Sequence, residues 1–180
     1  MQHTVNWPVS SDVYAGSFLY HMAPNLIHIG YVVGLDYKNP YLNPYEEFQQ
    51  LKTHKEIRPL LEGGECISYG ARCLNEGGFH AIPKLTFPGG MLAGCSAGFL
   101  NVAKIKGSHT AMKTGMLAAE SIFNRVKDVE ELDVLDTLEV SEYETSVMNS
   151  WVAEELKASR NFKGGFDKGL WAGLAHGGIV

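Results

Sequence analysis

The stretch from Gly89 to Glu120, GGMLAGCSAGFLNVAKIKGSHTAMKTGMLAAE, constrains the fold most, because it predicts three successive elements. A short apolar strand over Met91–Gly94 runs into a turn of small residues over Cys95–Gly98. A loop follows, and a helix begins near Gly107. The N-terminus of a helix presents free N–H groups and the positive end of the helix dipole. The segment therefore predicts a place for an electron-rich ligand.

On spacing alone, this turn is also compatible with an ordinary strand-to-helix connection in an α/β protein. Two features close to the turn favour a ligand. Asn101 carries both a donor and an acceptor, and Lys106 stands at the predicted helix start, where positive charge favours an anionic ring edge. A second glycine loop, Glu76–Phe79, is expected to close over the same ligand.

Composition excludes several other kinds of site. The net charge of −5, without a long run of one sign, argues against general nucleic-acid binding. Cys66, Cys73 and Cys95 lack CxxC spacing and predict reduced thiols, and the seven histidines share no ligand spacing, so we expect no metal site. No Ser-His-Asp set, HExxH or phosphate-binding glycine loop is present, and we expect no catalytic acid or nucleophile within the chain. Twenty glycines, many in pairs, predict tight turns and close backbone approach to a ligand, or simply a loop-rich protein.

The first seventy residues predict a small antiparallel sheet and a helix. Val5–Pro8 has the character of a strand, and Tyr14–Gly16 that of a turn. The apolar runs Ser17–His21 and Leu26–Gly34 predict a hairpin. Asn43 is the expected N-cap of a helix, with Pro44 at its first position and Glu46 completing a capping box. A short helix over Lys55–Leu61 and a strand segment over Glu65–Leu74 are expected to follow.

The second half predicts two long helices. One covers about Ser108 to Val126, with small residues that permit close packing; its expected apolar face is formed by Met112, Gly115, Met116, Ala119 and Phe123. The other runs from Ser141 to about Arg160, with Ser141 and Glu144 as its capping box. Its expected apolar stripe is Tyr143, Val147, Trp151 and Leu156. A charged connection over Lys127–Leu138 joins the two helices.

The last residues, Gly164 to Val180, are apolar, aromatic and glycine-rich. The run is too short to span a bilayer, which needs roughly 20 apolar residues. We expect the chain to be a fragment of a longer protein, cut at both ends.

Long stretches of the sequence resemble the electron transfer flavoprotein–ubiquinone oxidoreductase family. The resemblance covers Val5 to about Gly178 and is specific. It rests on the runs YAGSFLYH, VVGLDYKNPYLNPYEEFQ, IRPLLEGGECISYGARCLNEGGF, IPKLTFPGGMLAGCSAGFLNVAKIKGSHTAMKTGMLAAESIF and NSWVAEEL. The piece is similar to the middle of that enzyme, without the amino-terminal dinucleotide fingerprint and the carboxy-terminal cysteine-ligated [4Fe–4S] domain. The implied fold is α+β, part of a FAD-dependent oxidoreductase fold.

The resemblance implies that this chain supplies one half of a FAD site, its second FAD-contacting strand, turn and helix. The candidate FAD contacts are Gly94, Cys95, Gly98, Asn101, Val102, Gly107 and Thr110. Related flavoproteins often carry Gly-Asp at this turn, where the carboxylate binds ribityl hydroxyls. Here Cys95 follows Gly94, so backbone groups are expected to do more of the holding. Gly107 and Thr110 are expected near the isoalloxazine.

The resemblance also implies a quinone site and a membrane-surface element. The quinone-binding pair of glycines falls on Ala15 and Gly16, and the first of these departs from the family's glycine. A plain hairpin turn is the alternative there. The stretch from about Gly169 is expected to enter the membrane interface without crossing it. The implied division is a quinone-binding portion over 1–88, a FAD portion over 89–127 and a helical region over 128–180 that leads into the membrane-surface element.

The function implied is electron transfer from reduced electron transfer flavoprotein to ubiquinone, through FAD and a [4Fe–4S] cluster whose ligands lie outside this chain. The expected setting is the inner mitochondrial membrane or a bacterial cytoplasmic membrane. One alternative is a related FAD-dependent reductase or monooxygenase, similar to geranylgeranyl reductases, that acts on an isoprenoid or aromatic substrate. Another is that the chain alone is a non-enzymatic interaction module with half of a site.

Overall fold

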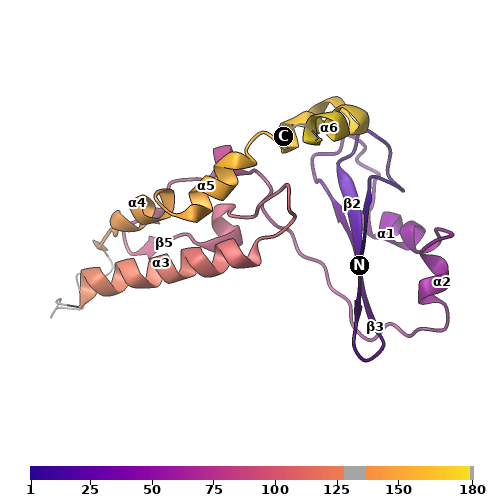
Figure 1. Cartoon of the computed structure of the whole chain (residues 1–180), viewed down its shortest axis with the longest axis horizontal. Helices are drawn as coiled ribbons and strands as arrows, with labels where there is room; N and C mark the ends of the chain where they lie inside the picture. Colours follow the sequence, from indigo (N-terminus) through magenta and orange to yellow (C-terminus); the bar gives the residue numbers. More distant parts are fainter. Residues whose placement is uncertain (128–136, 179–180) are drawn as a thin grey trace. The chain divides into compact units, whose positions relative to one another are not determined.

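The computed structural model describes residues 1–127 and 137–178, and it divides into two compact units (Figure 1). The first unit contains Met1–Gly70 and the described residues from Gly164 onward, and the second contains Ala71–Lys163. Both units contain helices, and each has a small antiparallel sheet, which confirms the predicted α+β class. The functional division at residues 88 and 127 stays a prediction.

The first unit is built on a three-stranded antiparallel sheet in the order β1-β2-β3. Its strands are β1 (Gln2–Val5), β2 (Ala15–Met22) and β3 (Leu26–Val33). The hairpin predicted from the two apolar runs is confirmed as β2 and β3. The strand expected over Val5–Pro8 is wrong, because β1 ends at Val5 and Asn6 turns the chain with a φ of 70°. Asparagine tolerates this left-handed conformation better than most residues.

The turn expected over Tyr14–Gly16 is also wrong, since Ala15 and Gly16 begin the central strand β2. Gly16 pairs with Val5 on one side and Val32 on the other. A Cβ built on Gly16 would stand 2.7 Å from the carbonyl oxygen of Thr4. Glycine is therefore needed here because the neighbouring strand approaches closely. In the sequence, such a glycine cannot be distinguished from a turn glycine.

One face of the sheet is covered by the helices α1 (Pro44–Lys52) and α2 (Arg58–Leu61). The side chain of Asn43 accepts a hydrogen bond from the Tyr45 N–H, which confirms the predicted N-cap. Leu19 of β2, Leu51 of α1 and Ile57 are buried together and form the core between sheet and helices. The alternating burial along β2 places Ala15, Ser17 and Leu19 on this face.

On the opposite face, the ring of Phe18 lies over Gly30 of the neighbouring strand. A Cβ at Gly30 would come within 2.3 Å of the Phe18 ring. Phe18 also stacks on Tyr20, with ring centroids 5.3 Å apart. An aromatic ring thus fills the space that the glycine leaves open, as occurs in other sheets with glycine positions.

In its described residues, the second unit packs helices against two short strands and two 3₁₀ segments. The strands are β4 (Thr86–Phe87) and β5 (Gly90–Met91), and the 3₁₀ segments are η1 (Phe79–Ala81) and η2 (Gly94–Ala97). The helices are α3 (Ser108–Val126), α4 (Glu142–Met148) and α5 (Trp151–Ala158). Their shared core is Leu85, Ala97, Phe99, Ala118, Tyr143, Val147, Val152 and Leu156.

The predicted helix over Ser108–Val126 is confirmed, but its expected apolar face is not the buried one. The residues buried on α3 are Thr110, Thr114 and Ala118. Met112 is 71% exposed and Phe123 is 65% exposed, and Met116 is exposed as well. The helix therefore uses its small and hydroxyl-bearing side for packing within the second unit.

The single helix expected over Ser141–Arg160 is two helices, because α4 ends at Met148 with Asn149 as its C-cap and Ser150 is the N-cap of α5. The Ser150 hydroxyl donates to the Val147 carbonyl oxygen at 2.7 Å and accepts from the Val152 N–H at 3.3 Å. Ser141 makes no side-chain cap. Serine competes with the helix for backbone partners in this way. Three residues of the predicted apolar stripe, Tyr143, Val147 and Leu156, are buried despite the break. The fourth, Trp151, is 43% exposed.

No strand forms over Glu65–Leu74, where Ile67 and Tyr69 are exposed and find no partner strand. Of the connection expected over Lys127–Leu138, residues 128–136 lie outside the described part of the chain. The chain ends in η4 (Lys163–Lys168) and α6 (Leu170–Gly177). Within the described residues, no helix has both the length and the apolar character needed to cross a membrane.

The contact between Phe18 and Gly30 generates a first prediction. Gly30→Ala forces the ring away from the sheet and should destabilise the β2–β3 hairpin by about 1–3 kcal/mol. Hydrogen exchange of peptides covering residues 15–33 would measure this as faster exchange. Gly70→Ala is the matched control, since a Cβ there meets nothing within 4 Å. Equal exchange in both variants would contradict the packing described.

Candidate functional site

The glycine turn of the second unit has a backbone that requires glycine at both ends. Gly94 has a φ of 62° and Gly98 a φ of 84°, a region that other residues rarely adopt. A Cβ at Gly94 would also stand 3.2 Å from the Cβ of Ala111 in α3. The turn therefore lies directly against the helix that follows it.

Two buried threonines of α3 fasten this turn and the next loop. The Gly94 N–H donates to Thr114 Oγ1 at 3.0 Å, and that hydroxyl donates to the Thr110 carbonyl oxygen at 2.9 Å. The Thr110 hydroxyl donates to the Phe99 carbonyl oxygen at 2.5 Å, with the Gly107 carbonyl oxygen 2.9 Å away. Both threonine side chains are fully buried. Turn, loop and helix start thus form one hydrogen-bonded assembly.

The start of α3 has no side-chain cap, and its N-cap residue is Gly107. The first N–H groups of a helix have no acceptor within the helix. Before the helix, residues 101–106 form a tight turn in which the Asn101 N–H donates to the Lys106 carbonyl oxygen at 2.9 Å. The predicted arrangement of turn, loop and helix N-terminus is therefore present, although its strand is only the two-residue β5.

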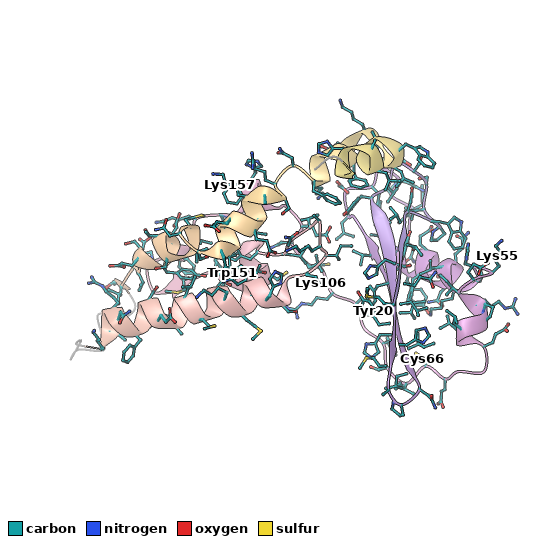
Figure 2. All side chains as sticks on the ribbon, in the orientation of Figure 1. Tyr20, Lys55, Cys66, Lys106, Trp151 and Lys157 are labelled. Carbon is teal, nitrogen blue, oxygen red and sulfur yellow. The ribbon has the colours of Figure 1, made fainter. Side chains whose placement is uncertain are left out.

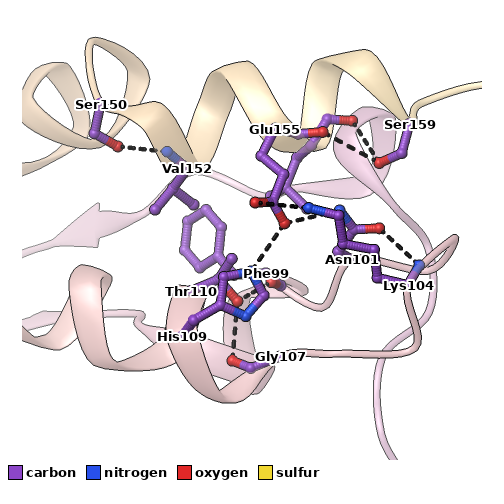
Figure 3. Close-up of polar contacts among 11 residues, drawn as sticks. Phe99, Asn101, Lys104, Gly107, His109, Thr110, Ser150, Val152, Glu155 and Ser159 are labelled. Carbon is purple, nitrogen blue, oxygen red and sulfur yellow. Dashed lines mark hydrogen bonds and ion pairs between the residues drawn. The ribbon is translucent and has the colours of Figure 1, made fainter.

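A carboxylate on α5 holds this loop from the side (Figure 3). Glu155 Oε1 accepts from Asn101 Nδ2 and from His109 Nε2, both at 2.8 Å, and Glu155 Oε2 pairs with Lys104 Nζ at 3.2 Å. The His109 ring also stacks on Trp151 of α5, with an interplanar angle of 9°. Trp151 is labelled in Figure 2. Loop, α3 and α5 therefore meet at one side chain.

The contacts of Glu155 strongly favour its ionised form. Burial alone would raise the pKa of this carboxyl. The hydrogen bonds from His109, Asn101 and Lys104 outweigh that effect and lower the pKa from 4.5 to about 2. Glu155 is therefore a carboxylate at every physiological pH.

A pocket of about 360 Å³ opens beside the glycine turn, within the second unit. Ser96, Ala97 and Gly98 form one wall, and Asn75, Glu76 and Gly77 belong to another. Asn75 Nδ2 donates to the Cys95 carbonyl oxygen at 3.1 Å. The residue before the second glycine loop therefore binds the first turn, and closure of both over one ligand stays a prediction. Burial raises the pKa of Glu76, and the charge of Lys163, which also lines the pocket, partly opposes this.

The seven candidate FAD contacts come together in this assembly but differ in accessibility. Cys95 and Gly107 are half-buried, and the other five are buried. The side chains of Asn101 and Thr110 are engaged in the hydrogen bonds that hold the loop. Direct contact between these seven residues and FAD stays a prediction. Thr114 and Glu155 were not identified from the sequence, since their partners lie 20 to 54 residues away and leave no local signal.

The candidate quinone residues lie in the first unit, at the start of β2. The Ala15 carbonyl oxygen accepts from the Asn6 N–H at 2.8 Å, and Ala15 is 8% exposed. A cavity of about 10 Å³, room for one water molecule, lies beside Ala15 and is also lined by Phe166 and Leu170. Tyr14 meets Phe166 edge to face at 5.2 Å. The carboxy-terminal segment thus packs against the strand that carries the candidate quinone residues.

Metal ligands are not gathered in the described part of the chain. No group of three or more His, Cys, Asp or Glu side chains there is placed to hold a metal ion. Cys66, Cys73 and Cys95 carry free thiols.

Comparisons with known proteins agree with the resemblance seen in the sequence. Residues 1–74 match the family model described as "ETF-QO, ubiquinone-binding". The chain is 55% identical to the human electron transfer flavoprotein–ubiquinone oxidoreductase, mitochondrial, over 99% of its own length. It is 54% identical to the protein of that name from Caenorhabditis elegans over 99% of the chain, and 49% identical to that from Dictyostelium discoideum over 98%.

The chain belongs to the electron transfer flavoprotein–ubiquinone oxidoreductase family. It spans about 30% of the length of each of these three relatives. The match to the ubiquinone-binding model covers most of the first unit and ends within the segment that leads into the second.

The lowered pKa of Glu155 generates a second prediction. The folded-state pKa lies below the unfolded value, so the stability that Glu155 contributes is fully present above about pH 4.5 and is lost as the pH falls towards 2. Glu155→Gln should therefore destabilise the protein by about 1–3 kcal/mol at pH 7. The difference should shrink towards pH 2. Urea unfolding of both proteins across this pH range would measure it, and a pH-independent difference would contradict the assignment.

Proposed function

We propose that the full-length protein transfers electrons from reduced electron transfer flavoprotein to ubiquinone, through FAD and a [4Fe–4S] cluster, at a membrane surface. The observation that carries this proposal is the family membership over 98–99% of the chain. The names of the relatives give the donor and the acceptor, and the family model matched by residues 1–74 gives ubiquinone binding. The cluster ligands would lie outside this chain.

The residues of the second unit fit one half of a FAD site. The positive-φ residue Gly98 lines the pocket beside the turn, and the uncapped N-terminus of α3 offers N–H groups to an electron-rich ring edge. Gly94, Cys95 and Gly98 would contact the cofactor mainly through backbone atoms. Bound FAD would supply the redox chemistry, and the protein would position and tune it.

Within this chain, the buried hydroxyl groups orient the backbone around the expected flavin and do not transfer protons. Thr110 and Thr114 hold the turn and the loop at set positions, so the N–H groups near Gly107 need no rearrangement when a ligand binds. Such preorganisation lowers the free-energy cost of binding. Glu76 is a carboxyl in the pocket, and burial raises its pKa above the usual value.

The first unit would supply the quinone site and the membrane contact. Ala15 and Gly16 stand at the start of β2, and the segment with Phe166 and Leu170 packs beside Ala15. In α6, Trp171 is 79% exposed and Leu174 is 44% exposed. Apolar side chains of this kind are suited to the membrane interface. A quinone leaving the bilayer would then meet β2 close to this surface. The mitochondrial naming of the relatives supports an inner mitochondrial membrane location.

The experiment that tests the proposal is expression of the full-length protein followed by two measurements. Bound FAD, measured by absorbance after denaturation, should approach one equivalent. Reduction of a soluble ubiquinone analogue should depend on reduced electron transfer flavoprotein. A FAD-dependent reductase of isoprenoid substrates, similar to geranylgeranyl reductases, would bind FAD yet fail the second measurement. A non-enzymatic module would fail both.

A third prediction concerns the pocket beside the turn. Gly98→Val places a branched side chain in the pocket at a backbone φ of 84° and should weaken FAD binding at least about tenfold. Retained flavin after gel filtration would measure the loss. Gly63→Val is the matched control, because it carries a similar φ of 79° in the first unit with nothing within 4 Å. An equal loss of flavin in both variants would assign the effect to general strain.

A fourth prediction concerns the exposed apolar side chains of α6. Trp171→Ser combined with Leu174→Ser should weaken binding to phosphatidylcholine vesicles by roughly a factor of ten or more, since each buried apolar side chain contributes about 1.5–3 kcal/mol. Vesicle co-sedimentation would measure it. Tyr41→Ser, at a position 91% exposed, is the control and should bind as the unaltered protein does. Unchanged binding of the double variant would exclude α6 as the contact.

A further inference from the structure

We propose that Glu155 is a positioning residue, which holds the turn over residues 101–106 in the conformation needed for flavin binding. The inference rests on the proposed FAD site and deepens it. Glu155 lies on α5, outside the strand, turn and helix to which FAD contacts were assigned. It therefore acts on the cofactor through other residues.

The first support is the convergence of three donors on one side chain. Asn101 and Lys104 come from the turn and His109 from the first turn of α3, while Glu155 stands some 50 residues further along the chain. The Glu155 side chain is 20% exposed. Figure 3 shows Asn101 and His109 reaching the carboxylate from different elements. One carboxylate thus fixes both ends of the loop that leads into α3.

The second support is backbone strain within the turn. Ile105 has a φ of 52°, in the left-handed region, and a β-branched residue there is a genuine outlier. Such a conformation is strained and persists only where its surroundings enforce it. The enforcement is visible here: residues 101 and 106 exchange backbone hydrogen bonds at 2.9 and 3.3 Å, and Asn101 Oδ1 accepts from the Lys104 N–H at 3.1 Å.

These two observations connect at Asn101. Its side chain is 1% exposed and uses both ends, the amide nitrogen towards Glu155 and the oxygen towards the Lys104 N–H. Without the negative charge of Glu155, the hydrogen bond that the buried Asn101 amide nitrogen donates is weakened, because a bond to a charged acceptor is stronger than a bond to a neutral one. The Asn101 amide is then free to rotate, and its oxygen no longer accepts from the Lys104 N–H. Ile105 can then relax from its strained conformation. The start of α3, where the flavin is expected, moves with the turn.

The charge of Glu155 contributes as well. Lys104 Nζ pairs with Glu155 Oε2, and the Lys104 side chain is 59% exposed. Among the described contacts, this ion pair is what holds the amine in place. Glutamine keeps the shape of Glu155 and one acceptor oxygen, but it presents an amide donor to Lys104. Glu155→Gln therefore tests the carboxylate with little change in volume.

The test uses the full-length protein with bound FAD and two local readouts. Glu155→Gln should raise the dissociation constant for FAD about tenfold or more, alter the visible circular dichroism of the bound flavin and speed hydrogen exchange in residues 101–107. Glu154→Gln, on the neighbouring exposed position of α5, should leave all three unchanged. Glu155→Asp, which keeps the charge on a shorter side chain, should fall between them.

A rescue variant distinguishes positioning from general stability. Glycine adopts a positive φ without strain, so Ile105→Gly in the Glu155→Gln background should recover part of the lost FAD affinity. Where Glu155→Gln fails to fold, Lys104→Met, which removes one contact only, should show the same changes at smaller size. Each of these recoveries and losses is measured at pH 7, where Glu155 is ionised.

The inference is overturned if Glu155→Gln retains the full FAD affinity, or if affinity falls only in step with global unfolding and exchange in 101–107 stays unchanged. Failure of the proposed function looks different: the unaltered protein then holds no FAD at all. In that case, unchanged exchange in 101–107 on Glu155→Gln would still refute the positioning of the turn.

Discussion

The pair of buried hydroxyls on α3 is the constraint on which the second unit depends. Thr110 and Thr114 stand one turn apart on the helix, and each binds a backbone group of the preceding segment. A Cβ at Gly94 would stand 3.2 Å from the Cβ of Ala111, so hydrogen bonds hold this end of the turn, while Ala97 packs into the apolar core. A buried backbone N–H needs such a partner, and Thr114 provides it for Gly94. The core residues Ala97 and Phe99 then reach α4 and α5 from a fixed backbone.

Glu155 adds a second fastening of a different kind. The threonines act over short distances along buried backbone, whereas Glu155 gathers charged and polar groups at the edge of the same assembly. The threonine hydrogen bonds set the position of the glycine turn, and the Glu155 contacts set the conformation of the loop that follows. Together they fix the helix N-terminus and the glycine turn that lines the pocket before any ligand binds, which is the arrangement that a site on a rigid scaffold requires.

Elements set by neighbouring residues could be predicted from the sequence. The bounds of α3, the cap at Asn43 and the β2–β3 hairpin all follow from caps, period and turn residues close by. The failures have two physical causes, which are partners far along the chain and local competition for backbone hydrogen bonds. Gly16 resembles a turn residue because the strand that crowds it lies elsewhere, and Ser150 breaks a helix that periodicity alone would continue. The role of Glu155 is decided by residues 46 to 54 positions away.

The first unit is discontinuous, and this has a consequence for the order of events during synthesis. The second unit is one uninterrupted stretch, so all of its partners leave the ribosome together and it can close as soon as Lys163 is available. The first unit must wait for the segment after Gly164, which supplies Phe166 and Leu170 beside Ala15. Such distant contacts form slowly, because a long loop has to close first. The nascent sheet therefore lacks the segment that covers one of its ends throughout the translation of the second unit.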